Sequence, residues 1–262
     1  MAHFRISIQH ITFTEQIHVM QSEMSNEVYI ITGGARRIGY ALTRFFSEQA
    51  KRVIISYRSE YPELAELRDR GVCCLYADFS TDRGINEFAE LVSQQLKEWG
   101  NASIRALIHN ASAWEKDGHD AVTLSHALDA MMQIHVKAPY LLNHLLAQSF
   151  APKADIIHFT DYVVEKGSDK HIAYAASKAA LENMTLSFAK KFAPAVKVNA
   201  IAPALIMFNP QDSDEYKQKA LDKSVMQCAP GEQEIIEAVS YLLRSSYVTG
   251  RTLHVDGGRH IR

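Results

Sequence analysis

Short apolar runs alternate with longer amphipathic segments over most of the chain. Runs at residues 28–32, 53–57, 72–76, 104–109, 156–160, 196–202 and 252–255 lack polar–apolar alternation, which is typical of strands buried on both faces. Between them, apolar residues recur at helical spacing near residues 38–46 and over residues 85–96, 124–146, 173–192 and 234–243. This alternation, with short loops, predicts a single-domain α/β Rossmann fold with a doubly wound, seven-stranded parallel sheet flanked by helices.

The first residues of the chain do not share this pattern. Residues 1–23 carry scattered apolar pairs without a core periodicity, and Met24 begins a segment that runs directly into the first strand. They also lack the basic start and the apolar stretch of a signal peptide. We expect residues 1–24 to be an N-terminal extension, either disordered or an upstream start, with a dimer-stabilising arm as the alternative. Residues 25–262 are expected to form the domain.

Composition and charge exclude several classes of partner. The chain has 262 residues, 47% of them apolar, and a formal net charge of −2, so it can bury a full core but carries no basic field for nucleic acid or an anionic membrane. No apolar run approaches the roughly 18 residues that a membrane helix needs. The three cysteines form no Cys-x-x-Cys pair and the histidines are scattered, which predicts no metal site and a reducing, cytoplasmic location. Cys73 and Cys74 are expected to be buried strand thiols.

A glycine-rich turn follows the first strand. The sequence Thr32-Gly33-Gly34-Ala35-Arg36-Arg37-Ile38-Gly39 leads directly into a helix. Glycine allows a tight turn and the close approach of a pyrophosphate, while the helix N-terminus offers free N–H groups and a positive dipole end. The position of this turn therefore predicts a dinucleotide-binding loop.

The end of the second strand indicates which dinucleotide binds. An NAD site of this type usually has Asp or Glu there, bonded to the ribose 2′-hydroxyl, whereas this chain has Ser56-Tyr57-Arg58-Ser59. Arg37 in the glycine loop and Arg58 at the strand end can both reach a 2′-phosphate, which a carboxylate would repel. The sequence therefore favours NADPH as the cofactor.

Tyr174 and Lys178 are the candidate catalytic pair. They stand at positions i and i+4 of the helix predicted over residues 173–192, so they share one face about 6 Å apart along the axis. A nearby ammonium stabilises tyrosinate and lowers a phenol pKa that is ordinarily about 10. Such a tyrosine can give a proton to an atom that receives a hydride.

With these motifs the chain resembles the short-chain dehydrogenase/reductase family from about residue 28 to the C-terminus. Further matches are Asp78 after the third strand, Asn110-Ala111-Ser112 after the fourth, Val198-Asn199-x-Ile201-x-Pro203 and Val255-Asp256-Gly257-Gly258. The resemblance implies that Asp78 and Asn110 support the adenosine half, that Lys178 holds the nicotinamide ribose, and that Tyr174 is the acid. It also implies a homo-oligomer, a dimer or tetramer built on the two long helices. The candidate cofactor-binding residues are Gly33, Arg36, Arg37, Ile38, Tyr57, Arg58, Ser59, Asp78, Phe79, Asn110, Ala111, Ser112, Thr160, Tyr174, Lys178, Pro203, Leu205 and Ile206.

Departures from the family pattern indicate the substrate class. Arg37 replaces the third glycine of the loop, Asp161 replaces the serine that usually lies 13 residues before the tyrosine, His135 replaces an asparagine of the long fourth helix, and Ala204 replaces the glycine after Pro203. The first two changes are similar to those in the pteridine reductases of this family. That resemblance implies a small-molecule pterin substrate.

The chemistry of Asp161 agrees with a pterin. A serine hydroxyl donates to a carbonyl oxygen that becomes an alkoxide, whereas a carboxylate would repel that charge. A pterin presents N–H and NH₂ donors and accepts hydride at C6 of a C=N bond. Asp161 can accept those donors and, with a raised pKa, help deliver a proton toward N5. The alternatives are direct delivery by Tyr174 or delivery through water, and a purely structural role for Asp161.

A flat heterocycle also needs stacking surfaces, and the loops at the same sheet edge supply aromatic residues. Trp114 and Phe208 are the candidate substrate contacts, together with Asp161 and Tyr174, and Tyr162 is a further loop aromatic. Residues 204–229 are expected to form a lid with a mobile stretch at 209–215 and with hinges at Pro203, Pro210, Pro230 and Gly231. For His135 two interpretations remain, a support for a relay water near Lys178 and a satisfied helix histidine.

Our hypothesis is NADPH-dependent reduction of a 7,8-dihydropterin to its tetrahydro form, with Asp161, Tyr174 and Lys178 at the chemical centre. Dihydrofolate reduction differs only in the tail, which needs a basic site for its glutamate, and the sequence does not place one. The alternative enzyme is a general NADPH-dependent carbonyl reductase. An alternative of another class is a non-catalytic NADPH-binding sensor, which would have no use for Tyr174 and Lys178.

Overall fold

A computed structural model of the chain describes residues 26–262, and the extension expected at residues 1–24 lies outside this range. Seven strands form one sheet in the order β3-β2-β1-β4-β5-β6-β7, and every neighbouring pair is parallel. The predicted fold class, a Rossmann fold with a seven-stranded parallel sheet, is confirmed. The strands are β1 (Glu27–Thr32), β2 (Arg52–Tyr57), β3 (Cys73–Tyr76), β4 (Ser103–His109), β5 (Phe150–Phe159), β6 (Val196–Pro203) and β7 (Thr252–Val255).

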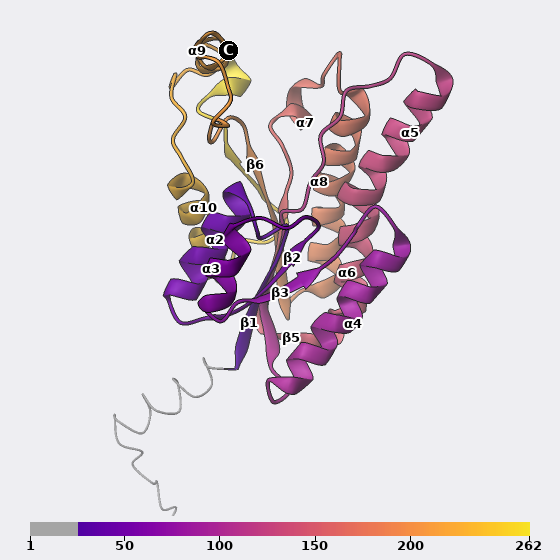
Figure 1. Cartoon of the computed structure of the whole chain (residues 1–262), viewed down its shortest axis with the longest axis vertical. Coiled ribbons are helices and arrows are strands. Elements are labelled where there is room, and N and C mark those ends of the chain that lie inside the picture. Colours follow the sequence, from indigo (N-terminus) through magenta and orange to yellow (C-terminus); the bar gives the residue numbers. More distant parts are fainter. Residues whose placement is uncertain (1–25) are drawn as a thin grey trace, which may run out of the picture.

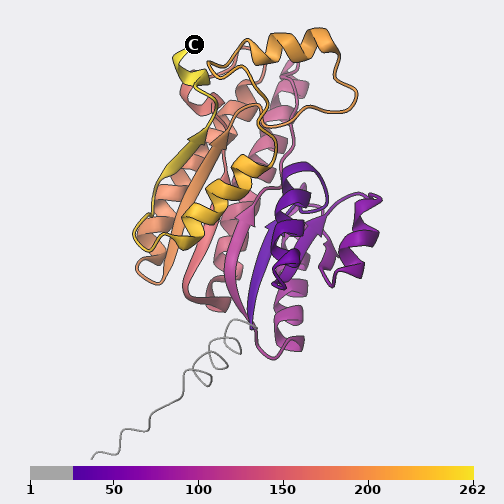
Figure 2. The same ribbon diagram turned by 90° about the vertical axis from the view of Figure 1, so that its left-hand side faces the viewer.

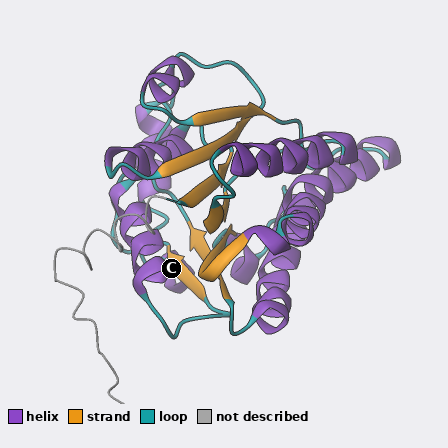
Figure 3. Ribbon diagram, turned by 90° about the horizontal axis from the view of Figure 1, so that it is seen from below, coloured by secondary structure: helices purple, strands orange, loops and turns teal. Residues whose placement is uncertain are grey.

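Helices cover both faces of the sheet (Figures 1 and 3). One face packs against α2 (Arg37–Glu48), α3 (Glu63–Asp69) and α10 (Gln233–Arg244). The other face packs against α4 (Asp82–Glu98), α6 (Ala138–Leu145) and α8 (Ile172–Phe192), with α5 (Ala121–Met132) beside α8. Alternate residues of one strand enter the two cores, as Ile30 and Ile31 of β1 do. This two-sided burial explains why the strands read as continuous apolar runs.

The helix predicted over residues 124–146 is not regular. It consists of α5 and α6 joined by a π-helical turn, Gln133–Lys137. A π turn adds one residue to a helical turn, and such turns occur often at functional sites. Here it directs Ile134 and His135 into the protein, where both are buried.

Two short helices lie at the carboxyl edge of the sheet that the sequence did not predict. The first, α7 (Val163–Lys166), follows β5, and the second, α9 (Asp214–Leu221), lies within the predicted lid and is capped by the Ser213 hydroxyl. Figure 2 shows α9 and the C-terminal segment at the same end of the molecule. The stretch at 209–215 therefore ends in a helix rather than in an irregular loop.

We expected Cys73 and Cys74 to be fully buried, and this expectation was wrong. Cys73 and Cys74 lie in β3 as predicted, but both are half-buried. Because β3 is an edge strand and pairs only with β2, it is less covered than the central strands. Local sequence pattern does not contain strand order, so it could not reveal this exposure.

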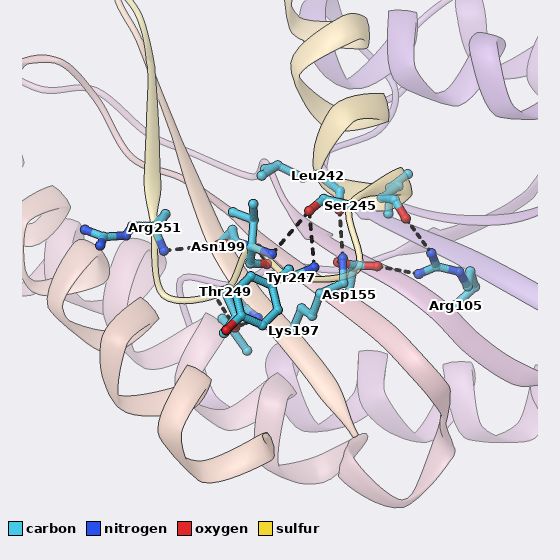
Figure 4. A network of polar contacts seen from close by, with 12 residues as sticks. Arg105, Asp155, Lys197, Asn199, Leu242, Ser245, Tyr247, Thr249 and Arg251 are labelled. Atoms are coloured by element: carbon cyan, nitrogen blue, oxygen red, sulfur yellow. Dashed lines mark hydrogen bonds and ion pairs between the residues drawn. The ribbon is translucent and has the colours of Figure 1, made fainter. Parts of the chain in front are cut away.

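A buried carboxylate anchors α10 to the sheet (Figure 4). Asp155 of β5 accepts hydrogen bonds from Arg105 of β4 at 2.5 Å and from Lys197 of β6 at 2.6 Å. Those two cations also donate to the carbonyl oxygens of Leu243 and Leu242 at the end of α10. Burial raises the pKa of Asp155, and the two cations oppose that rise.

No helix within residues 26–262 is long and apolar enough to cross a membrane.

Candidate active site

The glycine loop is held tightly against β2 and β4. Gly33 has a φ of +65°, its N–H donates to the Ser56 hydroxyl at 2.9 Å, and the Asn110 side chain donates to its carbonyl oxygen at 2.9 Å. A Cβ at Gly39 would lie 2.1 Å from the Gly33 oxygen, so only glycine fits where α2 crosses the loop. The turn leaves the start of α2 facing the carboxyl edge of the sheet, as an anion-binding loop requires.

Arg37 stands in a backbone conformation that suits the glycine it replaces. Its φ is +49°, a left-handed value that favours glycine and strains most other residues. Its guanidinium donates to the side chain of Asn209 and, at 3.2 Å, to the carbonyl oxygen of Met207. Arg37 therefore lines the cofactor cavity, as predicted for a residue near a 2′-phosphate, and also joins the glycine loop to the segment predicted to be a lid.

Most of the predicted cofactor residues line one cavity of about 450 Å³ at this edge. Arg58 is exposed at its rim, and Arg36 stacks over the ring of Tyr61, a lining residue that the sequence analysis missed. Asp78 is not part of the lining, because its carboxylate accepts the N–H of Ser80 within a turn. The predicted residues in the lining are Gly33, Arg36, Arg37, Ile38, Tyr57, Arg58, Ser59, Phe79, Asn110, Ala111 and Ser112.

The other predicted cofactor residues lie at the ends of β5 and β6. The Thr160 hydroxyl donates to the carbonyl oxygen of Ile201 at 3.2 Å, and the carbonyl oxygen of Pro203 accepts the N–H of Tyr162 at 3.1 Å. The segment predicted to form a lid leaves β6 past Leu205 and returns at Gly231, whose N–H donates to the Ile206 carbonyl oxygen at 2.9 Å and whose φ is +83°. The two ends of the lid are therefore joined by a hydrogen bond close to the predicted hinges.

Asp161 and Tyr174 are directly bonded to each other. The Tyr174 hydroxyl donates to one oxygen of Asp161 at 2.8 Å, and the Val163 N–H donates to the other at 2.9 Å. The short helix α7 supplies the second bond, so it fixes the carboxylate in position. Lys178 lies one helical turn beyond Tyr174, and its ammonium donates to the carbonyl oxygen of Phe159 at 2.8 Å.

The electrostatics of this centre differ from the expectation for Tyr174. Burial, followed by the charge of Asp161, raises the pKa of Tyr174 well above 10, so the phenol keeps its proton. We had expected Lys178 to lower this pKa, but its ammonium is directed at Phe159 and lies 5.7 Å from the centre of the tyrosine ring. Burial also lowers the pKa of Lys178 to about 8 and raises that of Asp161. The Tyr174 phenol thus keeps its proton and donates it in a hydrogen bond to Asp161.

His135 joins the cofactor side of the site to the tyrosine helix. Its Nδ1 lies 2.8 Å from the Ser177 hydroxyl, and its Nε2 lies 2.7 Å from the Ser112 hydroxyl. Ser177 donates to the Tyr174 carbonyl oxygen at 2.7 Å, so it accepts from His135, which places the imidazole proton on Nδ1. Burial, then the charge of Lys178, lowers the pKa of His135 to about 2, so it stays neutral. Of the two interpretations, the contacts fit a satisfied helix histidine that connects two segments of the site.

The start of α8 is fixed by a distant residue that the sequence analysis missed. The Asp117 carboxylate accepts the N–H groups of Ile172 and Ala173 at 2.7 and 3.1 Å, two positions before Tyr174 and next to it. It lies 55 residues away from Ile172, so no local signal could have found it. The negative charge also suits a helix N-terminus.

The predicted aromatic contacts are separated in space. Trp114 stacks on His171 at 4.3 Å between ring centres and is 61% exposed, so its other face is open to solvent. Tyr162 lies under the guanidinium of Arg259, 4.4 Å from its ring centre. Phe208 is half-buried in the lid, close to Met207 and Asn209, which hold Arg37. Within residues 26–262, no group of histidine, cysteine and carboxylate side chains is arranged to hold a metal ion.

Comparison with known proteins agrees with this fold and identifies the family. The family model described as "Enoyl-(Acyl carrier protein) reductase" matches residues 33–260. The chain belongs to the short-chain dehydrogenase/reductase family, as its motifs predicted.

Individual relatives place the chain more narrowly within the family. It is 58% identical over 234 residues to a protein named dihydromonapterin reductase from an Enterobacter species, covering 88% of this chain and 95% of the relative. It is 57% identical over 247 residues to the protein of that name from Klebsiella pneumoniae, covering 92% of this chain and 100% of the relative. Among solved structures it is similar to FolM alternative dihydrofolate reductase 1 from Brucella canis complexed with NADP. That similarity has a TM-score of 0.80 and 27% identity, and it covers 92% of this chain and 96% of the other.

Proposed function

We propose that this protein catalyses the NADPH-dependent reduction of 7,8-dihydromonapterin to tetrahydromonapterin, acting as an oxidoreductase on a C=N bond. The observation that carries the proposal is the 2.8 Å bond between Tyr174 and Asp161, at a position where the family usually has serine. A carboxylate there can accept the N–H and NH₂ donors of a pterin. The names of the relatives at 57–58% identity support the same substrate.

The residues of the cofactor cavity fit NADPH. Gly33 and Gly39 allow a pyrophosphate to approach the backbone at the start of α2. Arg36 and Arg37 of the glycine loop and Arg58 after β2 line the cavity, and its lining contains no carboxylate that would repel a 2′-phosphate. NADPH supplies the hydride when it is bound. The Brucella FolM structure was solved with NADP, which supports this choice.

Tyr174 and Asp161 hold the proton that N5 of the pterin receives. Tyr174 keeps its proton because its pKa is raised, and Asp161 accepts it in a hydrogen bond. When a pterin donor occupies the Asp161 oxygen, the Tyr174 hydroxyl is released from that bond and can donate toward N5. We assign the Lys178 ammonium, which donates to the carbonyl oxygen of Phe159, to the nicotinamide ribose, as the family resemblance implies. Delivery through Asp161 or water remains the alternative route.

The surroundings of the centre favour a flat substrate. We assign the open face of Trp114, which is backed by His171, as one stacking surface for the pterin ring, and Phe208 of the predicted lid as another. A simple ketone gains nothing from Asp161, since the carboxylate opposes the developing alkoxide. Dihydrofolate presents the same ring to the site, so we include it as a second substrate.

For the assembly and the location we propose a homo-oligomer in the cytoplasm, and two features of the exposed surface support this. Val122, Leu124 and Leu128 of α5 and Leu186 of α8 are 45–78% exposed, and this apolar face suits association of copies into a homotetramer or dimer. Cys228 is exposed and unpaired among the described residues, which suits a reducing cytoplasm. We expect no nucleic-acid or membrane partner.

The test follows NADPH oxidation by purified protein with 7,8-dihydromonapterin, 7,8-dihydrobiopterin, 7,8-dihydrofolate, a fully oxidised pterin and a diketone, with NADH as the control cofactor. Turnover of a dihydropterin with NADPH, lost in Asp161→Ser and Tyr174→Phe, supports the proposal. Turnover of the diketone alone would return the protein to the carbonyl reductases. Tight binding of NADPH without turnover of any compound would favour the sensor.

A further inference from the structure

The segment after β7 places the Arg259 guanidinium close to the site, and no carboxylate among the described residues pairs with it. Arg259 begins a short turn, Arg259–Ile261, and is half-buried with its guanidinium over Tyr162. The nearest acidic residue on the segment, Asp256, is occupied by the N–H of Gly258 and by the backbone and ring of His260. Among the described residues, Arg259 has no carboxylate within ion-pair distance.

The position of this cation is fixed by hydrogen bonds on both sides. The N–H of Met226 in the lid donates to the Gly257 carbonyl oxygen at 3.0 Å, and Arg262 donates to the Ser224 carbonyl oxygen at 2.9 Å. Lys166, at the end of α7, donates to the Arg262 carbonyl oxygen at 2.6 Å. The segment thus spans from α7 to the lid, the two elements that flank the site, and it presents Arg259 between them.

The cation lies next to the proposed chemical centre. Tyr162, on which Arg259 stacks, directly follows Asp161, and its N–H is held by Pro203 at the start of the lid. The charge of Arg259 acts on Asp161, where it partly opposes the rise in pKa that burial causes. Asp161 is already bonded to Tyr174 and Val163, so it does not pair with the guanidinium. The free donors of Arg259 therefore remain available to a ligand anion.

We propose that Arg259, stacked on Tyr162, forms a carboxylate subsite for the acidic tail of dihydropterins of the folate type. The inference rests on the proposed function, because it assumes that the pterin ring binds at Asp161 and Tyr174. The C6 tail begins at the carbon that receives the hydride, so it starts at this centre. A planar guanidinium with free donors matches a carboxylate in a bidentate geometry, and stacking on an aromatic ring preorganises it. A neutral hydroxylated tail gains no ion pair there.

The experiment compares 7,8-dihydrofolate with 7,8-dihydromonapterin in the full-length protein with NADPH. For each variant we take the ratio of kcat/KM for dihydrofolate to kcat/KM for dihydromonapterin. Arg259→Gln should lower this ratio about tenfold, which corresponds to about 1.4 kcal/mol of selective interaction. Arg259→Lys should lower it less, because the charge stays but the bidentate fork is lost. Added salt should lower the ratio in the unchanged protein and leave it level in Arg259→Gln.

Arg251→Gln is the matched control. It removes the same charge from an exposed arginine at the opposite end of β7, and it should leave the ratio unchanged. An unchanged ratio in Arg259→Gln, or an equal loss with both substrates, would overturn the subsite. If no dihydropterin is reduced at all, the proposed function fails, and the subsite is decided by binding instead. Folic acid should then lose affinity in Arg259→Gln in the presence of NADP⁺, while 6-hydroxymethylpterin does not.

Discussion

Replacing Asp161 with asparagine tests the centre of the proposed mechanism, and the structure sets the size of the effect. Each carboxylate oxygen accepts one hydrogen bond, one from Tyr174 and one from Val163. Asparagine has a single oxygen, so if Val163 keeps its acceptor, the amide NH₂ stands where the second oxygen would accept a pterin N–H donor, and that hydrogen bond is lost. Hydrogen bonds to charged groups contribute about 1.5–3 kcal/mol. A loss of about 2 kcal/mol corresponds to roughly a 30-fold fall in kcat/KM.

The thermal stability of the Asp161→Asn variant should not fall with its activity. Burial raises the pKa of Asp161, so the folded state disfavours the ionised form, and this cost grows as pH rises above the ordinary pKa of the carboxyl. Asparagine carries no such charge, so the melting temperature at neutral pH should be equal or higher. The assay is NADPH oxidation with 7,8-dihydromonapterin, with thermal unfolding measured on the same samples. Unchanged kcat/KM, or activity and melting temperature falling together, would refute this reasoning.

Three further predictions concern buried polar groups. In His135→Asn the new side chain is too short to reach both Ser112 and Ser177, so one hydrogen bond is lost. We expect kcat to fall about tenfold, the value of one hydrogen bond, with little change in KM for the pterin. Steady-state kinetics measure kcat and KM separately, and a change in KM alone would contradict a positioning role for His135. Asp155→Ala removes the buried carboxylate that pairs with the part-buried cations Arg105 and Lys197. The free energy of unfolding in urea should therefore fall by about 3 kcal/mol, and a loss below about 1 kcal/mol would contradict the account. His109 is buried with its pKa lowered to about 4, so below about pH 6.5 the unfolded chain takes up a proton that the folded chain refuses. Stability should therefore fall by up to about 3 kcal/mol between pH 6.5 and 4, and a His109→Gln variant should show a shallower fall in acid denaturation.

Part of this site could be predicted from the sequence because its determinants are local. A strand buried on both faces needs an apolar residue at every position, so the strands appear as uninterrupted runs. The pair Tyr174 and Lys178 shares a helix face because of helical spacing alone. The glycine loop is recognisable because backbone geometry at Gly33 and Gly39 tolerates no side chain.

Other features depend on contacts between residues far apart in the chain, and only the tertiary structure decided them. His135 meets Ser112 and Ser177 across 23 and 42 residues because a π turn rotates it inward, and no local pattern marks such a turn. The raised pKa of Tyr174 results from burial and from the direction of Asp161, neither of which spacing contains.

The edge strand β3 and the C-terminal segment also have features that only the tertiary structure decided. Cys73 and Cys74 have the apolar neighbours of a buried strand, but strand order places β3 at the edge and leaves them half-covered. Arg259 is one of many charged residues in the sequence, and only the fold of the C-terminal segment puts it on Tyr162. Local periodicity thus determined which elements form and which residue types they carry. Because burial, charge and hydrogen bonding depend on what packs against each element, the chemistry of the site was decided by the assembled fold.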